Sequence, residues 1–213
     1  AEPAMGTLVE IGIANGPAAD AEGACAAVFA EFARLESLFS EWRPETELGR
    51  VNAAAGVAPV AVSPEVFAIL ERSLEVSALT GGAFDPTFAA RWGLWTFGND
   101  GVKARPAAEA VEARRRLIDW RRVRIDATSR TVFLPEKGMK LGLGGIAKGY
   151  ATDRAVAILR ERGFHDFSLK AGGELFVSGK RGSRPWRVGI QDPRGHEPFA
   201  AIDLSDAAFD TSG

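Results

Sequence analysis

The feature that most constrains the fold is a glycine-rich turn that leads straight into a helix. Residues 143–153 read LGGIAKGYATD, and apolar residues then recur every three to four positions. This spacing predicts a helix over 146–162. N–H groups at a helix start carry partial positive charge, and glycines let a ligand approach the backbone closely. The turn, with Lys148 in the first helical turn, is therefore typical of a diphosphate-binding site.

Two nucleotide-binding motifs compete for this segment. A P-loop needs glycine before its lysine and Ser or Thr after it, whereas Ala147 precedes Lys148 and Gly149 follows it. Residues 142–147 fit the G-x-G-x-x-G/A string of dinucleotide-binding folds. Their neighbours, however, resemble hairpins rather than repeated strand–helix–strand units. The structural alternative is a tight strand-to-helix turn with an exposed lysine.

The rest of the chain mixes helical and strand periodicities. A helix is expected after Asp20 as its cap, a second after the pair Ser63-Pro64, and a third after Pro106. Strands separated by short polar turns are expected at 7–13, 123–125, 131–134, 139–143, 167–170, 174–177, 186–190 and 200–204. Helices intermixed with antiparallel strands predict the α+β fold class.

Composition excludes several kinds of protein. The 213 residues are 46% hydrophobic, which is enough for a buried core, and the net charge of -2 argues against a nucleic-acid partner. No apolar run reaches the length of a membrane helix. Cys25 is the single cysteine, so no internal disulfide forms, and we expect it in the core. An arginine-rich stretch over 114–124 predicts either a solvated helix face or a phosphate-steering patch.

A second candidate segment is residues 80–87, TGGAFDPT. It offers a carboxylate and backbone groups to a ligand, although a glycine pair before Asp-Pro also fits an ordinary turn. Four aromatic residues could line a flat apolar pocket nearby: Trp42, Trp92, Trp95 and Phe97. Core positions are the alternative, favoured for Trp92 and Trp186. The histidines, His165 and His196, lack metal-ligand spacing.

Eight strings occur along the chain in an order that resembles the FAD:protein FMN transferase family (ApbE-like proteins). They begin at Met5-Gly6-Thr7 and include FSEW at 39–42, ELGRVN at 47–52, GGAFDPT at 81–87 and Trp92-Gly93. Residues 143–153, 172–174, 186–190 and 211–213 complete the series. The resemblance implies an ApbE-like, T-fold-related domain of antiparallel strands packed with helices, spanning 1–213.

The resemblance also implies a chemistry. Such enzymes use Mg²⁺ and FAD, and they attach FMN through a phosphoester to a Thr or Ser of a client protein, often a subunit of a membrane redox complex. Carried over to this sequence, it implies FAD contacts from Met5, Trp42, Ala83, Phe84, Asp85 and Lys148. The Gly145 carbonyl would be the Mg²⁺ ligand, and no catalytic residue is assigned.

Two departures accompany the resemblance. Gly142 stands where the family usually has Asp, and the sequence ends at Gly213, before the family's C-terminal segment with its Mg²⁺ ligands. The family implies a periplasmic or cell-envelope location with a lipid anchor in the precursor, and the Ala-Glu-Pro start is compatible with signal removal. Two other functions stay open: hydrolysis of FAD to FMN and AMP, and FAD binding without catalysis.

Overall fold

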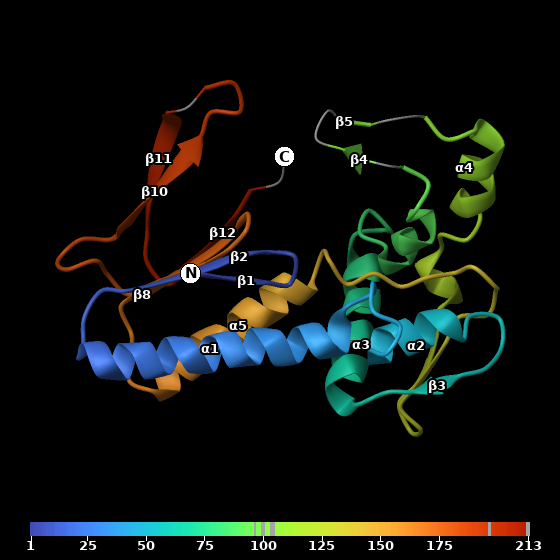
Figure 1. Cartoon of the computed structure of the whole chain (residues 1–213), viewed down its shortest axis with the longest axis horizontal. Helices are drawn as coiled ribbons and strands as arrows, with labels where there is room; N and C mark the ends of the chain where they lie inside the picture. The colour runs from blue at the N-terminus through green and yellow to red at the C-terminus, as the bar shows by residue number, and fades with distance from the viewer. Residues whose placement is uncertain (96, 99–100, 103–104, 196, 212–213) are drawn as a thin grey trace. The chain divides into compact units, whose positions relative to one another are not determined.

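The computed structural model describes residues 1–95, 97–98, 101–102, 105–195 and 197–211. Packing divides the chain into two compact units (Figure 1). The terminal unit consists of Ala1–Glu36 with Lys148–Gly213, and the central unit is Ser37–Ala147. The expectation of a single domain over 1–213 stays a prediction.

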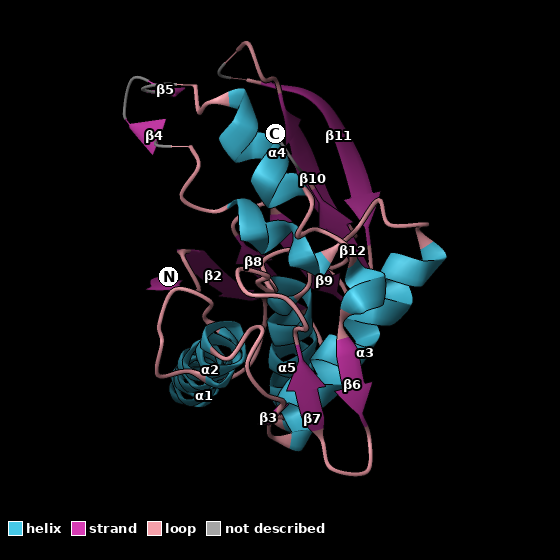
Figure 2. Cartoon of the chain, turned by 90° about the vertical axis from the view of Figure 1, so that its right-hand side faces the viewer, coloured by secondary structure: helices cyan, strands magenta, loops and turns pink. Residues whose placement is uncertain are grey.

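The terminal unit is built on a five-stranded antiparallel sheet in the order β1-β2-β8-β9-β12. The strands are β1 (Glu2–Ala4), β2 (Thr7–Ile13), β8 (Phe167–Ala171), β9 (Glu174–Ser178) and β12 (Ala207–Asp210). β10 (Trp186–Gln191) and β11 (Pro198–Leu204) pair separately as a long antiparallel ribbon (Figure 2). The predicted strands are confirmed here, and β1 and β12 are additions that the sequence analysis missed.

Two helices lie along one face of this sheet (Figure 1): α1 (Ala18–Phe39) and α5 (Ala147–Glu161). Apolar residues at a spacing of three to four along α1 form a fully buried stripe, which includes Val28, Phe32 and Leu35. The prediction that Asp20 caps α1 is wrong. The Pro17 carbonyl already accepts from the Ala21 N–H at 3.1 Å, so Asp20 lies inside the first turn.

The central unit holds the remaining elements. Its helices are α2 (Glu47–Ala53), α3 (Pro64–Leu79), α4 (Ala108–Arg115) and the 3₁₀ helices η1 (Pro86–Arg91) and η2 (Trp120–Arg122). Its strands are β3 (Val60–Ala61), β4 (Phe97–Gly98), β5 (Gly101–Val102), β6 (Arg124–Asp126) and β7 (Thr131–Phe133). As predicted, Ser63 caps α3 by accepting from the Val66 N–H, with Pro64 in the first turn. The strands predicted at 123–125 and 131–134 pair as the β6–β7 hairpin at the lower edge of Figure 2.

The predicted strand over 139–143 does not form. The alternation behind the prediction is present, because Met139, Leu141 and Leu143 are all fully buried. Among the described residues, however, no strand pairs with this segment. The Leu141 N–H and carbonyl bond to the Asn52 side chain at 2.7 and 2.9 Å, and the Gly142 N–H bonds to the Pro86 carbonyl at 2.8 Å. An asparagine amide therefore replaces a strand partner, and the α+β prediction is otherwise confirmed.

Candidate functional site

Two glycines of the 142–145 turn touch aromatic rings of the central unit. A Cβ on Gly145 would stand 3.0 Å from the Phe84 ring, and one on Gly142 would stand 3.1 Å from the Trp92 ring. A Cβ at either position would therefore require its neighbours to shift by a few tenths of an ångström. The two motifs predicted from sequence, 80–87 and 143–153, meet through Phe84 and Gly145.

Trp42 and Trp92 form a parallel stack in the same unit. Their ring centroids are 4.1 Å apart with an interplanar angle of 10°, and Phe88 meets Trp92 edge-on at 5.7 Å. Trp42 is 71% exposed, so its outer face is open to a planar ligand. The preference for a core position at Trp92 is wrong, because this ring is half-buried and lies in the aromatic cluster. Trp186 is half-buried too, and its indole N–H donates to the Ser178 carbonyl at 2.9 Å.

Glu41 is a functional candidate that the sequence analysis did not single out. Its Oε2 accepts from the Leu143 N–H at 3.3 Å, and its Oε1 lies 3.9 Å from where a Cβ on Gly144 would stand. Burial raises the pKa of Glu41 above its ordinary value, and the hydrogen bond from Leu143 opposes that effect. The contact joins residues 102 positions apart, so no local pattern could have indicated it.

The Asp85 carboxylate organises the loop that carries Ala83 and Phe84. Its Oδ1 accepts from the Thr87 N–H at 2.8 Å and from the Thr87 hydroxyl at 2.6 Å, and its Oδ2 accepts from the Trp120 N–H at 3.1 Å. The Phe84 N–H in turn donates to the Thr80 hydroxyl at 3.1 Å. Asp85 thus caps η1 and fixes the loop that carries Phe84.

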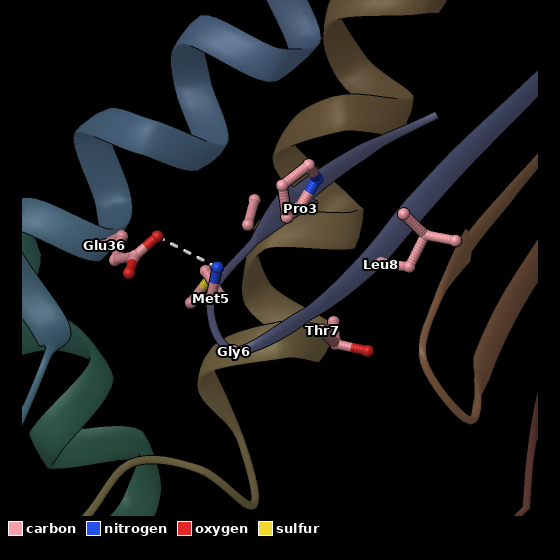
Figure 3. Close-up of a pocket in the computed structure, with 7 residues that line it drawn as sticks. Pro3, Met5, Gly6, Thr7, Leu8 and Glu36 are labelled. Carbon is pink, nitrogen blue, oxygen red and sulfur yellow. Dashed lines mark hydrogen bonds between the residues drawn. The ribbon is translucent and has the colours of Figure 1, made fainter.

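Met5 occupies a strained turn in the terminal unit. It joins β1 to β2 through a two-residue turn, with φ of 50° at Met5 and 72° at Gly6. The left-handed conformation is uncommon for a non-glycine residue and costs of order 1 kcal/mol or more. Figure 3 shows the Glu36 carboxylate directed at the Met5 N–H, which it accepts at 2.9 Å. Met5 and Glu36 line a cavity of 390 Å³.

Lys148 lies in the first turn of α5, as predicted. Its Nζ is 3.6 Å from Oε1 of Glu174, the residue that begins β9. Burial raises the pKa of Glu174, with the Lys148 charge lowering it and the Asp210 charge raising it further. The lysine that the resemblance assigns to the diphosphate is therefore paired with a half-buried carboxylate.

Other predicted features carry less chemistry. In the arginine stretch, Arg115 and Arg116 pair with Glu112 at 2.7 and 3.4 Å, which is how a solvated helix face behaves. Cys25 is half-buried rather than in the core. His196, Ser212 and Gly213 lie outside the described residues.

The described part of the chain contains neither a candidate membrane span nor a candidate metal centre. There, no helix is long and apolar enough to cross a bilayer. The same residues contain no group of three or more His, Cys, Asp and Glu side chains that could hold a metal ion.

Comparison with known proteins extends these observations. The model of the ApbE family matches residues 5–213. The chain is 34% identical to the FAD:protein FMN transferase of Treponema pallidum (strain Nichols) over 230 residues, covering 100% of this chain and 63% of that protein. It is 33% identical to the FAD:protein FMN transferase of Rhodobacter capsulatus over 211 residues, covering 98% of this chain and 40% of that protein.

Solved structures agree with the fold. The flavin transferase ApbE from Vibrio cholerae aligns with a TM-score of 0.85 at 26% identity, covering 97% of this chain and 68% of that one. The ApbE protein from Thermotoga maritima aligns with a TM-score of 0.81 at 29% identity, covering 97% and 67%. The chain thus spans about two thirds or less of these relatives. With a family model matched from Met5 to the last residue and the same fold in solved members, this chain belongs to the ApbE family.

Proposed function

We propose that this chain is the FAD-binding part of an FAD:protein FMN transferase. The observation that carries the proposal is the aromatic cluster beside the glycine turn of the central unit. An exposed indole on Trp42, backed by Trp92, offers a flat surface of the kind that stacks on an isoalloxazine ring. Phe84 packs on Gly145 in the segment that leads into α5, where a phosphate group is favoured.

The proposed contacts follow the family assignment. FAD is bound by Met5, Trp42, Ala83, Phe84, Asp85 and Lys148. Three of these have supporting geometry: the strained Met5 turn beside a cavity, the exposed Trp42 ring, and the loop that Asp85 holds. Lys148 would offset the negative charge of the diphosphate, and its Nζ lies 3.6 Å from the Glu174 carboxylate.

The proposed reaction transfers the FMN half of FAD to a hydroxyl group of a client protein. The hydroxyl oxygen of a Thr or Ser forms a bond to the FMN phosphorus, the diphosphate P–O bond breaks, and AMP leaves. The hydroxyl proton passes to a base that we do not assign within 1–213. The chain's own part is to hold the flavin and to orient the diphosphate.

Magnesium fits the donors near the turn as an ion held mainly by its substrate. Mg²⁺ commonly uses one or two protein oxygens, substrate phosphates and water. The Gly145 carbonyl is the proposed protein ligand, and Glu41 places one carboxylate next to Gly144. When bound, the ion supplies charge neutralisation on the diphosphate. A membrane redox-complex subunit as client, and a periplasmic or lipid-anchored cell-envelope location, complete the proposal.

The test is a transfer assay with the natural protein that contains this chain. FAD, Mg²⁺ and a candidate client are incubated, and the client is analysed by intact mass. We expect a mass gain of one FMN less one water, abolished when the acceptor Thr or Ser is replaced by Ala. Release of AMP without a client would instead favour the hydrolase alternative. Intact FAD with unmodified client would favour binding without catalysis.

A further inference from the structure

A second cavity in the terminal unit lies between α5 and the sheet edge formed by β9 and β12. Its volume is 260 Å³. Thr152 and Asp153 of α5, Glu174 and Phe176 of β9, and Asp210 of β12 contribute to its lining. We call it the α5–β9 pocket. Neither the aromatic cluster of the central unit nor the Met5 cavity includes any of these residues.

Two polar atoms at this pocket are buried without a partner. Thr152 is 6% exposed, and neither its hydroxyl oxygen nor Oε2 of Glu174 forms a hydrogen bond to any residue that the structure describes. Leaving such an atom unpaired costs about 1–3 kcal/mol, and more for a charged group. Native proteins rarely accept this cost twice in one place without a ligand, an ordered water or another part of the chain to meet it.

The negative charges at the pocket disfavour anionic ligands. Asp210 and Glu174 stand directly opposite each other in the β9–β12 ladder, where like charges destabilise a sheet. With Asp153 as a third carboxylate, the lining repels anions. Although three carboxylates line the pocket, no group of three or more His, Cys, Asp and Glu side chains among the described residues is arranged to hold a metal ion. Neutral groups that donate hydrogen bonds are the best match.

We infer that the α5–β9 pocket binds a vicinal diol of FAD. One hydroxyl would donate to Glu174 Oε2, and its neighbour would exchange a hydrogen bond with the Thr152 hydroxyl. This inference rests on the proposed function, because Lys148, the proposed diphosphate residue, pairs with Oε1 of the same Glu174. Both polyol parts of FAD, the adenosine ribose and the ribityl chain of FMN, are attached to the diphosphate. Either polyol can therefore enter the α5–β9 pocket while a phosphate is bound at Lys148.

The experiment measures the binding of AMP and of FMN separately to this chain by isothermal titration calorimetry. The variants are Glu174→Gln and Thr152→Val, and Glu10→Gln is the matched control on β2 of the same sheet. If the ribose occupies the pocket, Glu174→Gln weakens AMP about tenfold more than it weakens FMN, because the loss of the Lys148 partner affects the phosphate of both probes alike. If the ribityl chain does, FMN is weakened more than AMP. In either case the analogue that lacks the diol should bind to wild type as weakly as the parent ligand binds to Glu174→Gln. Those analogues are 2′,3′-dideoxy-AMP and a flavin whose N10 carries a phosphorylated pentyl chain without hydroxyl groups.

Thermal denaturation provides a second readout that does not depend on activity. Removing an unpaired buried hydroxyl relieves its desolvation cost, so Thr152→Val should raise the Tm of the ligand-free chain by about 2–4 °C. Adding the probe whose diol binds in the pocket should raise the Tm of Thr152→Val by less than it raises the Tm of wild type. Equal affinities for both probes in wild type and Glu174→Gln, or no binding of either probe, would overturn the inference. Flavin transfer by the natural protein is measured in a separate assay. Failure of the pocket inference therefore does not contradict the proposed transferase function, and failure of the transfer assay does not contradict diol binding.

Discussion

At the scale of single residues, much of the candidate site depends on side chains that hold backbone in place. Asp85 accepts three hydrogen bonds, and Glu41 accepts one from a segment far away in sequence. The residue types and the glycine strings were readable from the sequence. The contacts were not, since a motif gives no sign of which distant N–H a carboxylate will reach. The left-handed Met5 was equally hidden, because the usual residues of such a turn are Asn, Asp and Gly.

Replacing Met5 with Asn should separate stability from flavin binding. Asn tolerates the left-handed conformation, so Met5→Asn should stabilise the chain by about 1 kcal/mol. Loss of the thioether side chain should weaken FAD, measured by quenching of flavin fluorescence. Arg130 has φ of 48° in the β6–β7 hairpin, and Arg130→Asn is the control that should stabilise the chain without affecting FAD. Unchanged FAD affinity in Met5→Asn would remove Met5 from the proposed contacts.

Glu41 should make stability fall as pH rises. Burial raises its pKa above the ordinary 4.5, so the folded chain binds a proton more tightly than the unfolded chain does. That contribution is complete below pH 4.5 and is lost as pH rises through the folded-state pKa. Glu41→Gln should therefore be more stable than wild type at pH 8 and show little difference at pH 4, in urea denaturation. Glu45→Gln, at an exposed site, is the control. A gain of the same size at both pH values would contradict this account.

At the scale of elements, periodicity predicted burial better than pairing. The apolar stripe of α1, the cap of α3 and most strands follow from spacing and from capping residues. The segment at 139–143 shows the limit. Its alternation correctly gave the buried side chains, but a strand also needs a neighbour, and that neighbour is set by tertiary structure. Here an asparagine amide meets the backbone instead.

Removing that amide should loosen the approach to the glycine turn. Asn52→Ala leaves the Leu141 N–H and carbonyl without their partner in a buried segment, so we expect a loss of about 2–3 kcal/mol. Urea denaturation measures it. Asn15→Ala, which removes an exposed hydrogen bond to Asp166, is the control and should cost about 1 kcal/mol or less. Equal losses in the two variants would mean that the Asn52 bonds contribute little.

At the scale of the whole molecule, the comparisons establish the family and the fold class, and FAD is the ligand that we propose. The resemblance stated from eight ordered strings agrees with the family match over residues 5–213. Order along the chain could reveal the family because it does not depend on knowing any contact. The division into two compact units could not be read from the sequence, since both of its boundaries, Glu36/Ser37 and Ala147/Lys148, fall inside helices, α1 and α5.

Ligand linkage gives a prediction for the whole chain. FAD at one hundred times its Kd should stabilise the folded state by about 2.7 kcal/mol, which corresponds to a Tm rise of roughly 5–10 °C. Mg²⁺ added with FAD should increase the shift, and Mg²⁺ alone should give almost none. Differential scanning fluorimetry checks this, with NAD as the control dinucleotide. A shift of equal size with NAD would point to a general nucleotide site.

The stacked indoles also provide an intrinsic fluorescence signal for flavin binding. Trp42 is 71% exposed, so its emission lies at the red edge of the tryptophan spectrum, where it overlaps flavin absorption. A flavin that settles on this ring would accept its excitation energy. Tryptophan emission would then fall in proportion to occupancy, and a Trp42→Phe variant would lose that part of the response. Flavin capture and release could thus be followed in real time without any attached dye.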